Sequence, residues 1–138
     1  IRSAPLFQNN LLEKIDDIMK SSLEFILNTT LDDTQWSQAS LPISLGGIGI
    51  RKLESLAIPA YCSSVYSTED LVSQILNNSL LIDDQHLGTA EDIWKSFSLS
   101  NEIPSEKSIQ KNWDLPTAKN VFSSLKRVNL KDKARLIA

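Results

Sequence analysis

The chain has 138 residues, and with 41% hydrophobic and 22% charged residues its composition is ordinary for a globular protein; the formal net charge at pH 7 is −3. This length holds about one domain and one core, which excludes a complete polymerase of several subdomains. No run approaches the ~18 consecutive apolar residues of a membrane span, and no basic leader precedes the first apolar period, so we expect a soluble protein without a membrane partner.

The single cysteine and the two ends of the chain predict the compartment of the protein and its relation to a longer chain. Cys62 cannot form an internal disulfide, and its small and apolar neighbours favour a core residue in a reducing, intracellular compartment over a reactive thiol. The chain starts at Ile1 without a methionine and stops at Ala138 within a periodic apolar and basic pattern. We therefore expect it to be a piece of a longer protein.

Two amphipathic helices are predicted in the first third of the chain. Apolar residues recur at helical spacing over residues 10–27, with charged residues between them. A short second helix is predicted over residues 33–39, because an aspartate at its start can cap it and a proline follows its end. We expect Trp36 on this short helix to be buried against the first helix through Leu23 or Ile26.

A glycine-rich segment, residues 45–51, follows the second helix. It holds three of the four glycines of the chain, Gly46, Gly47 and Gly49. Glycine permits positive φ and a close approach of backbone, and the aliphatic residues Leu45, Ile48 and Ile50 are expected to be buried anchors. A flexible linker would lack such anchors, and a phosphate-binding loop would carry Lys-Ser or Lys-Thr at the next helix. We therefore expect an ordered, packed turn, called the Gly-rich turn below.

The rest of the chain also predicts helices. A third helix is expected over residues 51–66, with a kink or break at Pro59 because proline in a helix interior costs ~3 kcal/mol. Further helices are expected to begin at Ser67, Thr89, Pro104, Pro116 and Asn129, with a loop from Asn77 to Gly88. No sustained period-two run appears. The fold class is therefore all-α, an irregular bundle of short amphipathic helices with one ordered Gly-rich turn.

Catalytic and metal-binding patterns are weak. The segment 81–84, Leu-Ile-Asp-Asp, resembles a two-metal aspartate pair, but no β-hairpin pattern flanks it and no further carboxylate is marked, so a solvated loop is favoured. His86 is expected in the same loop without a second zinc ligand. Ser63 and Ser64 lack the glycines of a nucleophile elbow. We expect no catalytic residue, no metal site and no cofactor in this chain.

Charge is divided unevenly along the chain. Residues 1–106 carry 6 Lys/Arg and 15 Asp/Glu, a balance of −9, whereas residues 107–138 carry 8 and 2, a balance of +6. The candidate phosphate contacts in this basic part are Lys111, Lys119, Lys126, Arg127, Lys131 and Arg135. An exposed Trp113 would stack on an unpaired base. The alternative is a solvated helix face over a core that contains Trp113 and Phe122.

Arg51 and Lys52 are a second candidate for anion binding. They precede a helix, where unpaired backbone N–H groups and the helix dipole favour anions. The alternative is a surface pair that flanks a buried Leu53.

The Gly-rich turn also carries a resemblance to a known family. The run Gly46-Gly47-Ile48-Gly49-Ile50-Arg51, after Leu41-Pro42 and before an Ala- and Leu-rich stretch, resembles a segment that follows the palm of non-LTR retrotransposon reverse transcriptases. Four further segments resemble landmarks of the same region, two upstream and two downstream: Arg2-Ser3-Ala4-Pro5, Leu11-Leu12-Glu13, Gln110-Lys111-Asn112-Trp113-Asp114 and Lys133-Ala134-Arg135-Leu136-Ile137-Ala138. Residues 67–105 match loosely.

The resemblance implies a non-catalytic role. Residues 1–66 would be thumb-like helices and residues 67–138 a helical connection, together helping to hold the RNA–DNA primer-template duplex. The palm, with its magnesium-dependent active site, would lie elsewhere in the parent polyprotein, which would act in the nucleus. The residues leave one alternative open, a helical protein-interaction module with no nucleic-acid role, which an exposed apolar stripe would favour.

Overall fold

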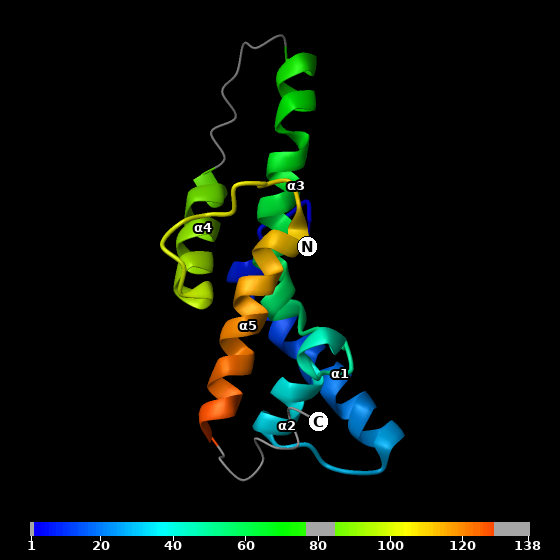
Figure 1. Ribbon diagram of the computed structural model, residues 1–138. Coiled ribbons are helices and arrows are strands. Elements are labelled where there is room, and N and C mark those ends of the chain that lie inside the picture. Colours follow the sequence, from blue (N-terminus) through cyan, green and yellow to red (C-terminus); the bar gives the residue numbers. More distant parts are fainter. Residues whose placement is uncertain (1, 77–84, 129–138) are drawn as a thin grey trace.

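The computed structural model describes residues 2–76 and 85–128. Within these ranges it contains α-helices and short 3-10 helices but no strand, so the prediction of an all-α fold is confirmed (Figure 1). The α-helices are α1 (Leu11–Leu27), α2 (Asp33–Ala39), α3 (Leu53–Ile75), α4 (Gln85–Ser98) and α5 (Gln110–Val128). The 3-10 helices are η1 (Leu6–Gln8) and η2 (Ile43–Leu45).

Helix α3 is the central element of the bundle. It contacts α1, α4 and α5, while α2 packs mainly against α5. Figure 1 shows α4 on the left of α3, α5 descending to the lower left and α1 descending to the lower right. All seven residues from 57 to 63 are buried, because neighbours cover this part of α3 on every side. Several of them are small, which lets the neighbouring helices approach closely.

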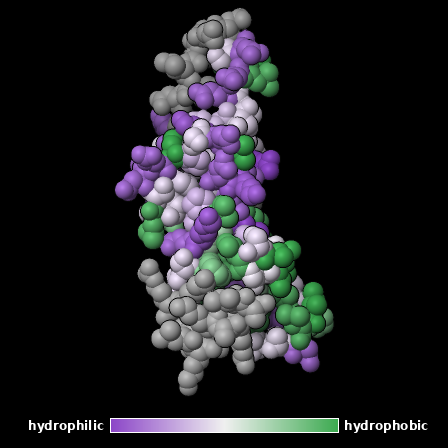
Figure 2. All heavy atoms as spheres, in the orientation of Figure 1, coloured by the Kyte–Doolittle hydropathy of each residue, from purple (hydrophilic) through white to green (hydrophobic). Residues whose placement is uncertain are grey.

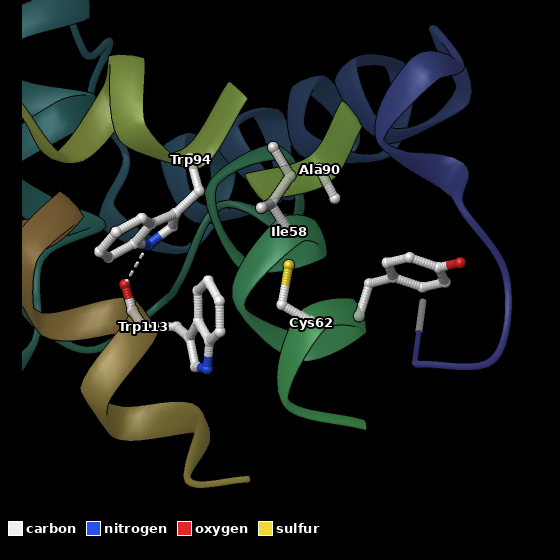
Figure 3. Packing of buried hydrophobic residues seen from close by; sticks show 6 residues of the cluster. Ile58, Cys62, Ala90, Trp94 and Trp113 are labelled. Atoms are coloured by element: carbon white, nitrogen blue, oxygen red, sulfur yellow. Dashed lines mark hydrogen bonds between the residues drawn. The ribbon is translucent and has the colours of Figure 1, made fainter. Parts of the chain in front are cut away.

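The core joins α3, α4 and α5 around two tryptophans (Figure 3). We call the buried set the tryptophan core: Ile58, Tyr61, Cys62, Ala90, Trp94 and Trp113. The two indoles meet edge to face, with ring centroids 5.1 Å apart. Trp94 Nε1 donates to the Trp113 carbonyl oxygen at 2.7 Å, and Trp113 Nε1 donates to the Lys107 carbonyl oxygen at 2.7 Å. Both buried N–H groups therefore have partners, so the core carries no desolvation penalty at these atoms.

Of the kink or break expected at Pro59, the break is wrong, and so is the restart at Ser67, because α3 runs without interruption from Leu53 to Ile75. The kink stays a prediction. Pro59 is fully buried, and the packing of three helices around it outweighs the lost backbone hydrogen bond. The hydroxyl of Thr68 donates to the Ser64 and Val65 carbonyl oxygens, at 3.0 and 3.1 Å. It therefore bonds to the preceding turn, as in a helix interior, and does not cap a new helix.

A second proline prediction fails in the same way. The helices expected to begin at Pro104 and Pro116 are one helix, α5, which begins at Gln110 and contains Pro116. Residues 99–109 form the connection from α4 to α5 and contain no helix. Trp113, Ala118 and Leu125 are buried along the length of α5, so one continuous apolar face spans the proline.

The predicted loop from Asn77 to Gly88 is also wrong in part. Helix α4 begins at Gln85, so His86 and Gly88 are helical residues. Residues 77–84, which include the Asp83-Asp84 pair, and the helix predicted from Asn129 lie outside the described residues. The expected division between residues 66 and 67 falls within α3. The division into a thumb-like and a connection segment stays a prediction.

The Gly-rich turn is ordered and packed, as predicted. Gly46 and Gly49 have φ values of +83° and +81°. A Cβ on Gly47 would lie 2.0 Å from the Leu41 carbonyl oxygen, so this position admits no side chain without a backbone shift. The expected burial of the three anchors is wrong, because Ile48 is 54% exposed and Leu45 and Ile50 are only half-buried. Leu41, before the turn, is the buried anchor, and its carbonyl oxygen accepts from the Gly49 N–H at 3.1 Å.

Helices α1 and α2 form where the sequence predicts them. The Asp32 carboxylate accepts from the Gln35 N–H at 2.7 Å and the Gln35 side chain accepts from the Asp32 N–H, which is a capping box. The predicted burial of Trp36 is confirmed. The expected packing of Trp36 against α1 through Leu23 or Ile26 stays a prediction: Leu23 is buried and Ile26 is 76% exposed, and α2 packs mainly against α5.

Candidate nucleic-acid interface

The basic residues of α5 lie on the half of the helix that its buried residues leave free, with Lys119 opposite the buried residues and Lys111 at one edge. At about 100° per residue, the buried residues of α5 fall within one half of the helix circumference; these are Trp113, Thr117, Ala118 and Leu125. Lys111 and Lys119 fall on the other half and are exposed. Lys126 and Arg127 occupy positions on that same outer half near the end of α5, although their side chains lie outside the described part. Within the described side chains, the outer half of α5 therefore exposes two cations, Lys111 and Lys119.

The only acidic residue of α5 does not weaken this surface. The Asp114 carboxylate accepts two hydrogen bonds from the Arg51 guanidinium, at 2.5 and 2.6 Å. Both side chains are about four-fifths buried, which makes this bidentate pair a structural clamp between the residues before α3 and the first half of α5. The clamp neutralises Asp114 and occupies Arg51, so phosphate contact by Arg51 requires that the clamp open.

Lys52 is also held by protein groups. Its Nζ donates to the Ser37 Oγ at 3.1 Å and lies 5.8 Å from the centroid of the Trp36 ring. Phosphate contact by Lys52 would give up both interactions. The sequence interpretation of the Arg51-Lys52 pair as an anion site stays a prediction, while the structure shows a role for both residues in holding α2, α3 and α5 together.

The backbone N–H groups at the start of α3 are not unpaired, contrary to expectation. The Asp16 carboxylate accepts from the Leu53 N–H at 2.7 Å and from the Glu54 N–H at 3.0 Å. The position that a bound anion would take at this helix terminus is thus filled by a buried carboxylate of α1. Sequence reasoning missed Asp16. The clue was its place within the apolar arc of α1, between Leu12 and Leu23.

Trp113 is fully buried, so the proposed stacking of a base on its ring is wrong and the alternative of a buried tryptophan is confirmed. Its ring stacks on Tyr66, with centroids 6.0 Å apart, and Lys107 Nζ lies 4.7 Å from the Tyr66 ring centroid. Burial raises the pKa of Tyr66 well above its usual range, and its hydrogen bond to the Glu91 carboxylate adds to this effect. The Tyr66 phenol is therefore neutral at physiological pH.

A cavity of about 220 Å³ lies among α2, α3, α4 and α5. Its apolar wall includes Leu41, Ile58 and Trp94. Three of the polar side chains on its wall donate to backbone carbonyl oxygens: Ser40 to Ser37, Thr117 to Asp114 and Asn120 to Phe97. Two more, Arg51 and Lys52, are held by the side chains of Asp114 and Ser37. Most of the polar groups around this cavity are therefore engaged by the protein itself.

Within residues 2–76 and 85–128, no three His, Cys, Asp or Glu side chains gather as they would around a metal ion. In the same part of the chain, no helix combines the length and the apolar character needed to cross a membrane. Two of the candidate phosphate contacts, Lys131 and Arg135, lie outside the described residues. Comparison with protein-family models, with curated proteins and with solved structures gives no match for this chain.

Proposed function

We propose that this chain is a non-catalytic thumb and connection segment of a non-LTR retrotransposon reverse transcriptase, and that the outer face of α5 contacts the backbone of the RNA–DNA primer-template duplex. One observation carries the proposal. Exposed Lys111 and Lys119 share the outer face of α5 with the positions of Lys126 and Arg127, while the Arg51 clamp neutralises Asp114.

The dimensions of α5 suit backbone contact. From Lys111 to Arg127 the helix extends about 24 Å, and a duplex carries one phosphate charge per ~1.7 Å of its axis, so a duplex laid along this face offers many phosphates to the cations that point toward it. Contacts of this kind hold a duplex without reading its sequence. The acidic balance of residues 1–106 favours an approach of the duplex from the α5 side.

Salt dependence of binding tests the proposal. If about three cations contact phosphates, the logarithm of the affinity for an RNA–DNA hybrid falls against the logarithm of salt concentration with a slope of roughly −3. Lys119→Glu should flatten this slope by about one unit. Lys14→Glu makes the same charge change at an exposed position of α1 and is the matched control, which should leave the slope unchanged.

The double change Lys126→Glu/Arg127→Glu tests the end of α5 and should flatten the slope by about two units. Equal effects of Lys14→Glu and Lys119→Glu would reject α5 as the contact surface. Binding that does not depend on salt, or no binding at low salt, would reject the duplex-holding role.

In this proposal the catalytic steps belong to the parent enzyme. Its palm would bind the magnesium ions and perform phosphoryl transfer in the nucleus, and the rest of the parent polyprotein would be the main protein partner of this chain. The chain itself would supply helices that position the duplex and would need no cofactor.

A protein-interaction module is the second candidate function. The observation that favours it is the exposure of large apolar side chains on α1, among them Ile18, Phe25 and Ile26. Residues of this size and exposure on neighbouring turns of one helix are typical of a surface that another protein covers.

A further inference from the structure

The cavity among α2, α3, α4 and α5 is large enough to hold a small ring compound. Its volume is about 220 Å³. An apolar protein cavity of about 150 Å³ holds benzene, so this cavity has room for a fused two-ring molecule of about nine non-hydrogen atoms. Ser55 and Phe97 lie on its wall and are exposed. The cavity therefore opens to solvent, and a ligand can enter it.

The wall of the cavity is apolar and already formed. Leu41, Ile58, Trp94 and Ala118 line it, and each is at most 6% exposed. Ile58 and Trp94 are also members of the tryptophan core (Figure 3). The wall therefore cannot close over the cavity without a rearrangement of the close-packed core.

The charges around the cavity balance one another. Arg51 and Lys52 on its wall are positive, and Glu54 is negative. Asp114, the clamp partner of Arg51, supplies a second negative charge, so the balance is zero. A charged ligand would lose its hydration at the apolar wall without gaining a net opposite charge. The cavity therefore favours an uncharged molecule.

One hydroxyl at the cavity is open to a ligand. Ser40 and Thr117 donate to backbone carbonyl oxygens, whereas the Ser55 hydroxyl has no hydrogen-bond partner in the part of the chain that the structure describes. A hydroxyl can both donate and accept. Ser55 therefore offers the ligand one hydrogen bond at the edge of the cavity.

Two aromatic residues favour a flat ring as the ligand. Trp94 lies on the wall, and Phe97, which is 58% exposed, also lines the cavity. Aromatic pairs that meet edge to face or offset gain energy beyond their buried area, and a rigid ring loses no internal rotation when it binds. A ring in the cavity would also cover part of the exposed Phe97 side chain, which adds to the affinity.

We propose that this cavity binds a small uncharged aromatic molecule with one hydrogen-bonding group, of the size of indole. The rings lie against the apolar wall, and the ring N–H donates to the Ser55 hydroxyl. For a ligand of about nine non-hydrogen atoms we expect a dissociation constant on the order of 100 µM.

The exposed apolar residues of α1 are the competing place for an aromatic probe. Figure 2 shows hydrophobic residues gathered at the lower right, over the outer part of α1 and the Gly-rich turn. Phe25 on α1 is 88% exposed and does not line the cavity. A substitution of Phe25 therefore controls for non-specific binding to exposed apolar surface.

The inference does not rest on the duplex-holding proposal. The residues of α5 that line the cavity include the buried Thr117 and Ala118, whereas Lys119 lies on the opposite side of the helix. Binding of a ring compound and affinity for an RNA–DNA hybrid are also separate measurements, so the failure of one proposal is distinguishable from the failure of the other.

Titration of the isotope-labelled 138-residue chain with indole, followed by two-dimensional NMR, tests the proposal. The indole N–H signal of Trp94 should shift and saturate, while that of Trp36, which does not line the cavity, should not move. Ala118→Leu fills the cavity and should weaken binding about tenfold or more, whereas Phe25→Ala should leave it unchanged. Equal effects of the two changes, or a Trp94 signal that does not shift up to about 5 mM indole, would overturn the proposal.

Ser55→Ala tests the hydrogen bond and leaves the apolar wall intact. It should weaken the binding of indole about fivefold, and it should not change the binding of indene, which has the same shape without the N–H. Because Ser55 is exposed, this comparison does not depend on the folding of Ala118→Leu, which circular dichroism checks.

An indole carboxylate tests the preference for an uncharged ligand and should bind about tenfold more weakly than indole. Tighter binding of the carboxylate than of indole, or an equal loss for indole and indene in Ser55→Ala, would overturn the chemistry assigned to the ligand.

Discussion

The tryptophan core and the N-terminal limb, by which we mean residues 11–51 with α1, α2 and the Gly-rich turn, are held in different ways. In the core, Cys62, Trp94 and Trp113 are essentially inaccessible to solvent, and burial of large rings provides most of the stabilisation. The limb leaves large apolar side chains such as Phe25 in solvent. It is attached through buried apolar side chains such as Trp36 and Leu41 and, in addition, through specific polar contacts, among them the Asp16 cap and the Arg51 clamp.

The difference shows how a small bundle can keep an apolar surface uncovered and still hold its shape. Hydrogen bonds and ion pairs fix direction, whereas apolar contact depends on area alone. A few directional contacts therefore help to orient the limb, while large apolar side chains on the outer side of α1 remain exposed. Three substitutions test this comparison, from the largest expected effect to the smallest.

Trp113→Ala should be the most damaging of the three. It removes a fully buried ring that contacts both Trp94 and Tyr66, and the free energy of unfolding should fall by ~3–5 kcal/mol in urea denaturation. Phe97→Ala is the control, because Phe97 lies on the neighbouring helix α4 and is mostly exposed; its effect should stay below ~1 kcal/mol. Similar losses for the two variants would contradict the central place of the tryptophan core.

Gly47→Ala should destabilise the limb by ~2–3 kcal/mol, because the new Cβ would meet the Leu41 carbonyl group and force the backbone of the turn to shift. Gly88→Ala is the matched control. A Cβ on Gly88 meets nothing within 4 Å, and alanine favours the helix α4, so this variant should gain ~0.5–1 kcal/mol. Thermal unfolding of both variants checks the opposite signs, and a neutral Gly47→Ala would refute the steric argument.

Asp16→Asn should have the smallest of the three effects, a loss of ~1–2 kcal/mol, since an amide keeps the shape of the carboxylate but gives up its charge and one acceptor. Hydrogen exchange gives the sharper measurement. The amides of Leu53 and Glu54 should exchange faster, whereas the Trp94 indole N–H should keep its protection. Asp17→Asn changes the exposed neighbouring position and is the control, which should leave the exchange rates of the two amides and of the indole N–H unchanged. If exchange of the Trp94 indole N–H became faster to the same extent, the limb and the core would open together.

The parts of the fold that depend on local pattern could be predicted from the sequence. The periodicity of α1, the aspartate cap of α2 and the ordered Gly-rich turn all follow from neighbouring residues. The prolines show the limit of this reasoning. Local rules predict breaks at Pro59 and Pro116, but packing against other helices overrides them, and such packing cannot be read from a window of the sequence.

The candidate site shows the same limit for charges. A count of Lys and Arg identifies the basic face of α5, since exposure follows from helical position. It cannot show that Arg51 is held by Asp114, because the two residues are far apart in the chain and meet only in the folded state. Nor can the periodicity of α1 show which part of its broad apolar arc is covered, since buried Leu23 and exposed Ile18 both have helical spacing.

The Arg51–Asp114 clamp also has a consequence for the order of assembly during folding. It joins residues 63 positions apart, whereas the Trp94–Trp113 hydrogen bond joins residues 19 apart. Closing the longer loop from the unfolded chain costs about 1 kcal/mol more in chain entropy. Once α3, α4 and α5 have packed together, the core holds Arg51 and Asp114 near each other. Only then does formation of the clamp cost little chain entropy. We therefore expect the core helices to assemble first and the limb to dock last.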